Sequence, residues 1–102
     1  MRKTIEQEIL LILLEKEILE PKYLDQMNLH PVTKENKGML ISDIVKVSGC
    51  CYATAFKIVH NAEKNKMMKG YIPEDRAWKV YHLTPKGEKA AKYLRKVFGK
   101  EK

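Results

Sequence analysis

The chain has 102 residues, of which 44% are hydrophobic and 32% charged, so we expect one small domain with a modest core. Its formal net charge of +7 comes from the second half. Residues 1–51 hold seven basic and eight acidic residues, whereas residues 52–102 hold thirteen and five. This basic half favours a polyanionic partner such as nucleic acid. A solvated, lysine-rich helical surface is the plainer alternative, and a membrane surface is disfavoured because the basic half lacks a long apolar helical face.

The sequence predicts neither a membrane span nor a secretion signal. The longest apolar run, residues 9–14, has six residues, far fewer than a transmembrane helix needs. Acidic Glu6 and Glu8 interrupt the basic N-terminus and no small-residue cleavage site follows, so we expect a cytoplasmic protein. The scarcity of Gln beside many Lys, Glu and Ile favours a thermophilic, archaeal source.

Residues 4–19 form the first predicted helix, because Thr4 and Gln7 have the spacing of a capping box. Nine of the fifteen residues from 5 to 19 are Ile or Leu, and they cover more than one side of the helix. We expect one side to cover the rest of the domain and the other to contact a second subunit. The residues expected at this homodimer interface are Ile5, Ile9, Leu10 and Leu13 on this helix and Leu94, Val97 and Phe98 on the last helix.

The connector, residues 20–38, contains two prolines. Pro21 at a first helical position predicts a short helix that ends near Asn28, and residues 28–38 are expected to form a loop. Residues 39–41 are apolar and short enough for one edge strand.

Residues 42–65 have the pattern of a helix-turn-helix. Ser42 is the expected N-cap of its first helix, and Ser48 with Gly49 provides the turn. The apolar residues of the second helix recur at helical spacing and predict one buried stripe. That stripe consists of Cys51, Ala55, Ile58, Val59 and Ala62. In such a motif the second helix can enter the major groove of DNA.

Two extended runs follow, residues 67–72 and 78–83, separated by the polar, proline-containing residues 73–77. This pattern predicts a β-hairpin, in which we expect Trp78 to pack on the sheet. Thr84 as N-cap and Pro85 in the first turn then begin a basic helix that extends to about Phe98. The predicted fold class is therefore mainly α with one small hairpin.

The segment Tyr81-His82-Leu83-Thr84-Pro85-Lys86-Gly87 resembles the Y-x-L-T-x-K-G signature that closes the wing of many prokaryotic winged-helix transcriptional regulators. Residues 59–68 are similar to the family's L-x-x-L-E-x-x-G-L-I ending of the recognition helix, and the resemblance covers residues 39–94. It implies a winged helix-turn-helix fold and DNA binding. The chain departs from the family at Lys66, where a helix-ending Gly is usual, so Gly70 is expected to share that role. It also departs at the acidic residues Glu74 and Asp75 of the wing tip.

The expected contacts to double-stranded DNA lie on one face of the second helix and beside the wing. They are Tyr52, Ala53, Lys57, His60, Asn61 and Lys64 on the helix and Arg76 and Lys79 beside the wing. Lysines suit guanine or phosphate, and Asn61 suits a bidentate contact to adenine. The alternatives are an ordinary polar helix surface and wing cations paired with the acidic tip. Phe56 lies on the same face, where we favour a place beneath a neighbouring loop over contact with a thymine methyl group.

Adjacent Cys50 and Cys51 provide neither a disulfide framework nor metal-ligand spacing. A redox switch or an intersubunit bridge is one interpretation, and two small residues packed at a turn is the other. His30, His60 and His82 share no spacing, so we expect no metal, and no catalytic constellation or cofactor site is visible. The sequence predicts a non-enzymatic, homodimeric, sequence-specific transcriptional regulator. The alternatives are an architectural DNA-binding protein, a winged helix that binds proteins, and a regulator with an effector pocket between the connector and the first helix.

Overall fold

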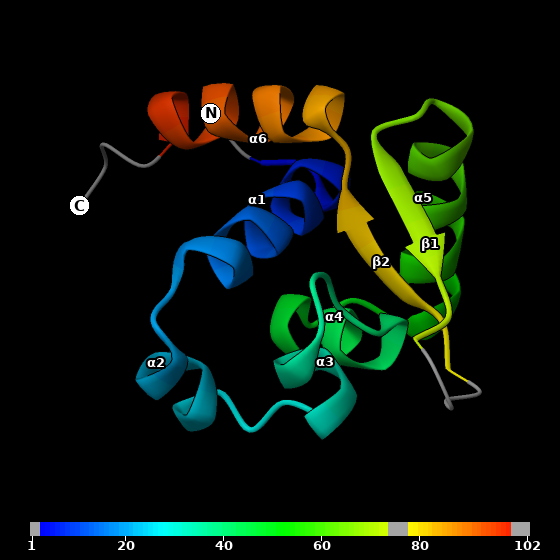
Figure 1. Cartoon of the computed structure of the whole chain (residues 1–102). Coiled ribbons are helices and arrows are strands. Elements are labelled where there is room, and N and C mark those ends of the chain that lie inside the picture. The colour runs from blue at the N-terminus through cyan, green and yellow to red at the C-terminus, as the bar shows by residue number, and fades with distance from the viewer. Residues whose placement is uncertain (1–2, 74–77, 99–102) are drawn as a thin grey trace.

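The computed structural model describes residues 3–73 and 78–98, which are arranged as a helical body with a two-stranded hairpin at one side (Figure 1). Their secondary structure, in chain order, is α1 (Ile5–Ile18), α2 (Pro21–Gln26), α3 (Pro31–Glu35), α4 (Ile41–Ser48), α5 (Tyr52–Lys64), β1 (Met68–Tyr71), β2 (Val80–Leu83) and α6 (Pro85–Phe98). This order confirms the predicted fold class. Among the described residues, no helix combines the length and the apolar character needed to cross a membrane.

Helix α1 begins with the predicted capping box. The Thr4 hydroxyl accepts a hydrogen bond from the Gln7 N–H (3.1 Å), and the Gln7 side chain accepts one from the Thr4 N–H (2.9 Å). The helix packs against α6, α4 and β2. Consequently Ile9, Leu10 and Leu13 are buried in the chain's own core. This differs from the expectation that they face a second subunit.

The connector is more ordered than predicted, because residues 31–35 form helix α3 where we expected a loop. A polar network explains the difference. Asp43 is only 2% exposed, and its carboxylate accepts hydrogen bonds from the His30 N–H (3.2 Å) and the Thr33 hydroxyl. The Thr33 hydroxyl oxygen in turn accepts from the Leu40 N–H (3.2 Å). Buried polar groups that satisfy each other in this way fix one arrangement of the chain.

Helix α4 begins at Ile41 with Leu40 as its N-cap, so the prediction of Ser42 as N-cap was wrong. The chain stays extended up to Leu40 because Met39 exchanges two backbone hydrogen bonds with Tyr81, at 2.8 and 2.9 Å. This single bridge replaces the predicted strand over residues 39–41. Gly49 then ends α4 in the left-handed conformation, with φ of 79°.

Helix α5 buries Ala55, Val59 and Ala62, as the apolar stripe predicted, whereas Ile58 is half-buried. Cys51 lies outside the stripe, because it is the N-cap of α5 and is exposed.

Lys66 adopts φ of 62° after α5 and therefore performs the helix-ending role itself. The Lys66 N–H donates to the Glu63 carbonyl (3.1 Å) and the Met67 N–H to the Ala62 carbonyl (2.8 Å), which is a Schellman motif. Gly70 lies within β1 and does not share this role. The hairpin pairs antiparallel, as predicted.

The residues of the Y-x-L-T-x-K-G segment fasten α6 to the end of α5. The Thr84 hydroxyl donates to the Lys66 carbonyl (2.5 Å) and accepts from the Gly87 N–H (3.1 Å), so Thr84 is the predicted N-cap. The Thr84 N–H also donates to the Met67 carbonyl (3.0 Å). A Cβ atom on Gly87 would lie 2.0 Å from the Met67 carbonyl oxygen, so only glycine allows this approach. The segment therefore sets the position of the hairpin relative to α5.

Candidate nucleic-acid interface

One face of α5 points to solvent along the whole helix, because the buried stripe occupies the opposite side. The exposed residues of this face include every position predicted on it: Tyr52, Ala53, Lys57, His60, Asn61 and Lys64. Among the described residues, the side chains of Lys57, Asn61 and Lys64 make no hydrogen bond or ion pair of their own. Their polar groups are therefore free to bind an external partner. That this partner is DNA remains a prediction.

Aromatic rings continue along this face at helical spacing. Tyr52 and Phe56 stack with ring centroids 6.3 Å apart, and Phe56 and His60 follow at 4.2 Å. Phe56 is 44% exposed, so it does not lie beneath a neighbouring loop as we expected. The reason is that the hairpin contacts α5 near Glu63, beyond this part of the helix.

The hairpin is joined to α5 by Lys79. Its ammonium group lies 3.4 Å from the Glu63 carboxylate and 5.3 Å from the centroid of the Tyr81 ring. Lys79 is thus beside the exposed face of α5 but already has an acidic partner. The other predicted wing contact, Arg76, lies outside the described residues, as do Glu74 and Asp75.

We predicted that Trp78 packs on the sheet, but it does not. It precedes β2, is 50% exposed, and contacts the His30 ring edge-on with centroids 4.4 Å apart. His30 is the N-cap of α3, so the end of the hairpin touches the connector. The sequence pattern of β2 gave no sign of this contact, because it depends on the unpredicted helix α3.

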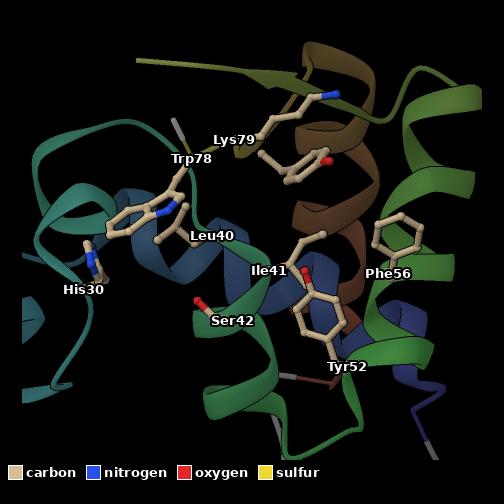
Figure 2. Close-up of a pocket in the computed structure, with 9 residues that line it drawn as sticks. His30, Leu40, Ile41, Ser42, Tyr52, Phe56, Trp78 and Lys79 are labelled. Carbon is tan, nitrogen blue, oxygen red and sulfur yellow. The ribbon is translucent and has the colours of Figure 1, made fainter. Parts of the chain in front are cut away.

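Between α5, the start of α4, the connector and the hairpin lies an open cavity of about 340 Å³. Figure 2 shows Trp78 and His30 on one side of it, Phe56 and Tyr52 on the other, and Lys79 above. The remaining lining residues are Leu40, Ile41, Ser42 and Tyr81. The predicted effector pocket was placed between the connector and the first helix, whereas this cavity adjoins the second helix of the helix-turn-helix. Sequence reasoning missed it because its walls come from four separate segments.

The two cysteines are free thiols in different settings. Cys50 is half-buried, with its Sγ 3.1 Å from the Ser48 hydroxyl. Cys51 is exposed at the N-terminus of α5, and its Sγ lies 3.0 Å from the Thr54 hydroxyl. Hydrogen bonding by the Thr54 side chain lowers the pKa of the Cys51 thiol below its usual value. Across the part of the chain that the structure describes, no group of three or more His, Cys, Asp or Glu residues has the geometry of a metal site.

The residues predicted for dimerisation differ in their exposure to solvent. Ile5 and Val97 are exposed at 42% and 44%, Phe98 is half-buried, and Leu94 packs on the core. Near them lies a groove of about 450 Å³ that is lined by residues of α1, α4 and α6. It is lined by Leu11, Ile12, Val47 and Phe98 together with Lys3, Glu8, Glu15 and Arg95. Ile5, Val97 and Phe98 thus remain candidates for contact with a second subunit.

The comparisons with known proteins give a fold and no family. No protein-family model matches this sequence, and no curated protein does. Solved structures of MepR from Staphylococcus aureus do match. A MepR mutant is 20% identical, with a TM-score of 0.65, and the match covers 96% of this chain and 59% of that one. A mutant bound to an oligodeoxyribonucleotide is 19% identical over 95% and 58% of the two chains, with a TM-score of 0.66.

A MepR–DNA complex gives 18% identity and a TM-score of 0.64, over 96% of this chain and 59% of that one. This chain therefore spans somewhat less than three fifths of the length of these structures. Identities this low establish a shared architecture only. The chain has the winged helix-turn-helix fold.

Proposed function

We propose that this chain is a non-enzymatic, homodimeric DNA-binding protein that recognises specific double-stranded sequences and regulates transcription. The observation that carries the proposal is the solvent-facing side of α5, which presents the unpaired polar groups of Lys57, Asn61 and Lys64 along one helix. A helix of this kind fits the major groove, where side chains reach base edges. The MepR structures bound to DNA add support by analogy of fold.

In this proposal five exposed residues of α5 have roles set by their chemistry. Lys57 and Lys64 contact guanine or phosphate, and the Asn61 amide makes two hydrogen bonds to adenine. Tyr52 at the start of the helix donates to a phosphate, and the small Ala53 lets the helix approach the groove closely. Lys79 faces a phosphate next to the hairpin while it keeps its ion pair with Glu63.

Dimerisation places two copies of α5 on one DNA duplex. The exposed apolar side chains of Ile5 and Val97 and the neighbouring groove between α1, α4 and α6 are the surface that we assign to the second copy. A two-fold axis through this surface requires half-sites separated by about one helical turn, or a multiple of it. Sedimentation of the Ile5→Glu, Val97→Glu double variant tests this step. We expect a monomer, and an unchanged dimer would exclude this surface.

The test of DNA binding is fluorescence anisotropy with a random duplex and a selected-site pool, at low and physiological salt. We expect enrichment of a palindrome and steep salt dependence. In the Lys57→Ala, Lys64→Ala variant the log–log salt slope should fall by about one unit per lost phosphate contact.

A matched control removes the same charge from α6, where Lys89 and Lys92 are exposed, and should leave the slope closer to that of the parent. Equal effects of the two double variants would contradict the assignment of α5. Equal affinity for random and selected DNA would favour the architectural alternative. No binding to either would favour a protein-binding role.

A further inference from the structure

Three large aromatic side chains are exposed around the cavity beside α5. Tyr52 is 57% exposed, Phe56 is 44% and Trp78 is 50%. Because water solvates such rings poorly, exposed apolar groups that gather around one hollow mark a binding site rather than chance exposure. The volume of about 340 Å³ lies within the range of small-ligand sites.

Each of the three aromatic side chains contacts another ring. Phe56 stacks with Tyr52 and touches the His60 ring at a tilt of 37°, and Trp78 is held edge-on by His30. Each ring therefore has neighbours that restrict its rotation before any ligand arrives. A planar ring that enters the cavity meets surfaces that are already oriented, which reduces the entropy lost on binding.

Two cationic side chains lie near the cavity, one of them paired with Glu63. Lys79 lines the cavity, and Lys57 is exposed one residue beyond Phe56 on α5. An aromatic surface beside cationic side chains is the arrangement that proteins use for unpaired nucleotides, because the base stacks while the phosphates meet the positive charges. Within a paired duplex both faces of every base are covered by stacking. An aromatic cavity can therefore receive a base only when that base leaves the stack.

We propose that this cavity binds one unpaired nucleobase, so that the protein prefers DNA carrying an extruded or single-stranded base next to the site occupied by α5. The inference rests on the proposed function for the position of the DNA. The base enters between Phe56 and Trp78, and its flanking phosphates lie towards Lys57 and Lys79. The duplex contacts of α5 remain as described above.

The experiment compares three fluorescent duplexes of one sequence: fully paired, with one bulged adenine, and with a bulged abasic nucleotide at the same position. The abasic duplex matches the flexibility and charge of the bulge and lacks only the ring. We expect the adenine bulge to bind at least about fivefold more tightly than either other duplex, because stacking on an aromatic side chain contributes that much or more. Equal affinity for the adenine and abasic bulges would overturn the proposal.

Trp78 is the only tryptophan in the chain, so its fluorescence reports on the cavity directly. We expect the adenine bulge, but not the abasic bulge, to quench it. The Phe56→Ala variant should lose the preference for adenine, while Tyr93→Ala, which removes an aromatic ring that is 68% exposed on α6, should keep it. Because both rings are exposed, both variants should fold, and thermal melting checks this. Retention of the full preference in Phe56→Ala would also overturn the proposal.

Two outcomes separate this inference from the proposed function. Tight, equal binding of all three duplexes would refute the cavity and leave the duplex-binding function standing. Quenching of Trp78 by a single-stranded oligoadenylate, without affinity for any paired duplex, would support the cavity and refute the duplex-binding function.

Discussion

Replacing Lys66 by glycine should stabilise the protein, because Lys66 adopts a backbone conformation that glycine adopts more easily. Lys66 holds a left-handed conformation, with φ of 62°, so that the Lys66 and Met67 N–H groups can close the Schellman motif on α5. That conformation costs an L-residue about 1–2 kcal/mol because its Cβ crowds the following carbonyl. Glycine avoids this cost but loses roughly 0.5–1 kcal/mol more backbone entropy on folding. We therefore expect the free energy of unfolding to rise by about 0.5–1 kcal/mol.

Chemical denaturation measures this difference, and the melting temperature should rise by roughly 2–8 °C for a domain of this size. The Lys66→Ala variant is the matched control, since it removes the same charge but keeps the Cβ atom. It should show no comparable gain. Gly49→Ala is the reciprocal change: its φ is 79° and an added Cβ would meet nothing within 4 Å. Its loss of about 1 kcal/mol should thus come from the backbone alone. A Lys66→Gly variant no more stable than Lys66→Ala would refute the reasoning.

Three further predictions concern other parts of the chain. Gly87→Ala should lower the free energy of unfolding in urea by at least about 1–3 kcal/mol, because its Cβ would overlap the Met67 carbonyl, and an unchanged midpoint would exclude that close approach. Asp43→Ala should cost roughly 2–4 kcal/mol in the same assay, because two donors of the buried network lose their acceptor. In a chain whose other cysteine is alanine, Thr54→Val should raise the pKa of Cys51, and therefore slow its alkylation near neutral pH and move the pH–rate midpoint upward. An unmoved midpoint would show that the Thr54 hydroxyl does not set this pKa.

The elements that the sequence predicted well are those whose signals are local. The Thr4 capping box, the buried stripe of α5 and the Thr84 N-cap each depend on residues within one or two helical turns. Such signals survive in the folded chain because the same short-range hydrogen bonds and periodicity operate there. The elements predicted wrongly depend on distant partners. Helix α3 depends on the buried Asp43 network, which joins residues ten and thirteen positions apart, and the start of α4 depends on the bridge between Met39 and Tyr81.

The first helix shows why a local count of apolar residues misleads. Its Ile and Leu residues exceed what one face needs, and a second subunit was the simplest explanation. In the structure α6, α4 and β2 all pack on α1, so most of that excess covers the chain's own core. Only Ile5 at the start of the helix and Val97 near the end of α6 keep substantial exposure among the residues assigned to an interface. The dimer contact that we propose is therefore smaller and more peripheral than the sequence suggested.

The aromatic cavity follows from the same distinction between local and distant signals. From the sequence, Phe56 projects between Tyr52, Ala53 and His60 on one helix face, and Trp78 belongs to a strand pattern, so each has a plain explanation by itself. Their association appears only because helix α3 brings His30 under Trp78 and the Lys79–Glu63 ion pair holds the hairpin against α5. The same ion pair makes the cavity dependent on charge. Breaking it should free the hairpin from α5, so Glu63→Gln should weaken quenching of Trp78 by the adenine bulge even though it removes a negative charge from a DNA-binding surface. If the surface acted only through its positive charge, removing the Glu63 charge would instead tighten DNA binding. The direction of the change therefore distinguishes a cavity whose shape depends on the ion pair from a surface that attracts DNA by charge alone.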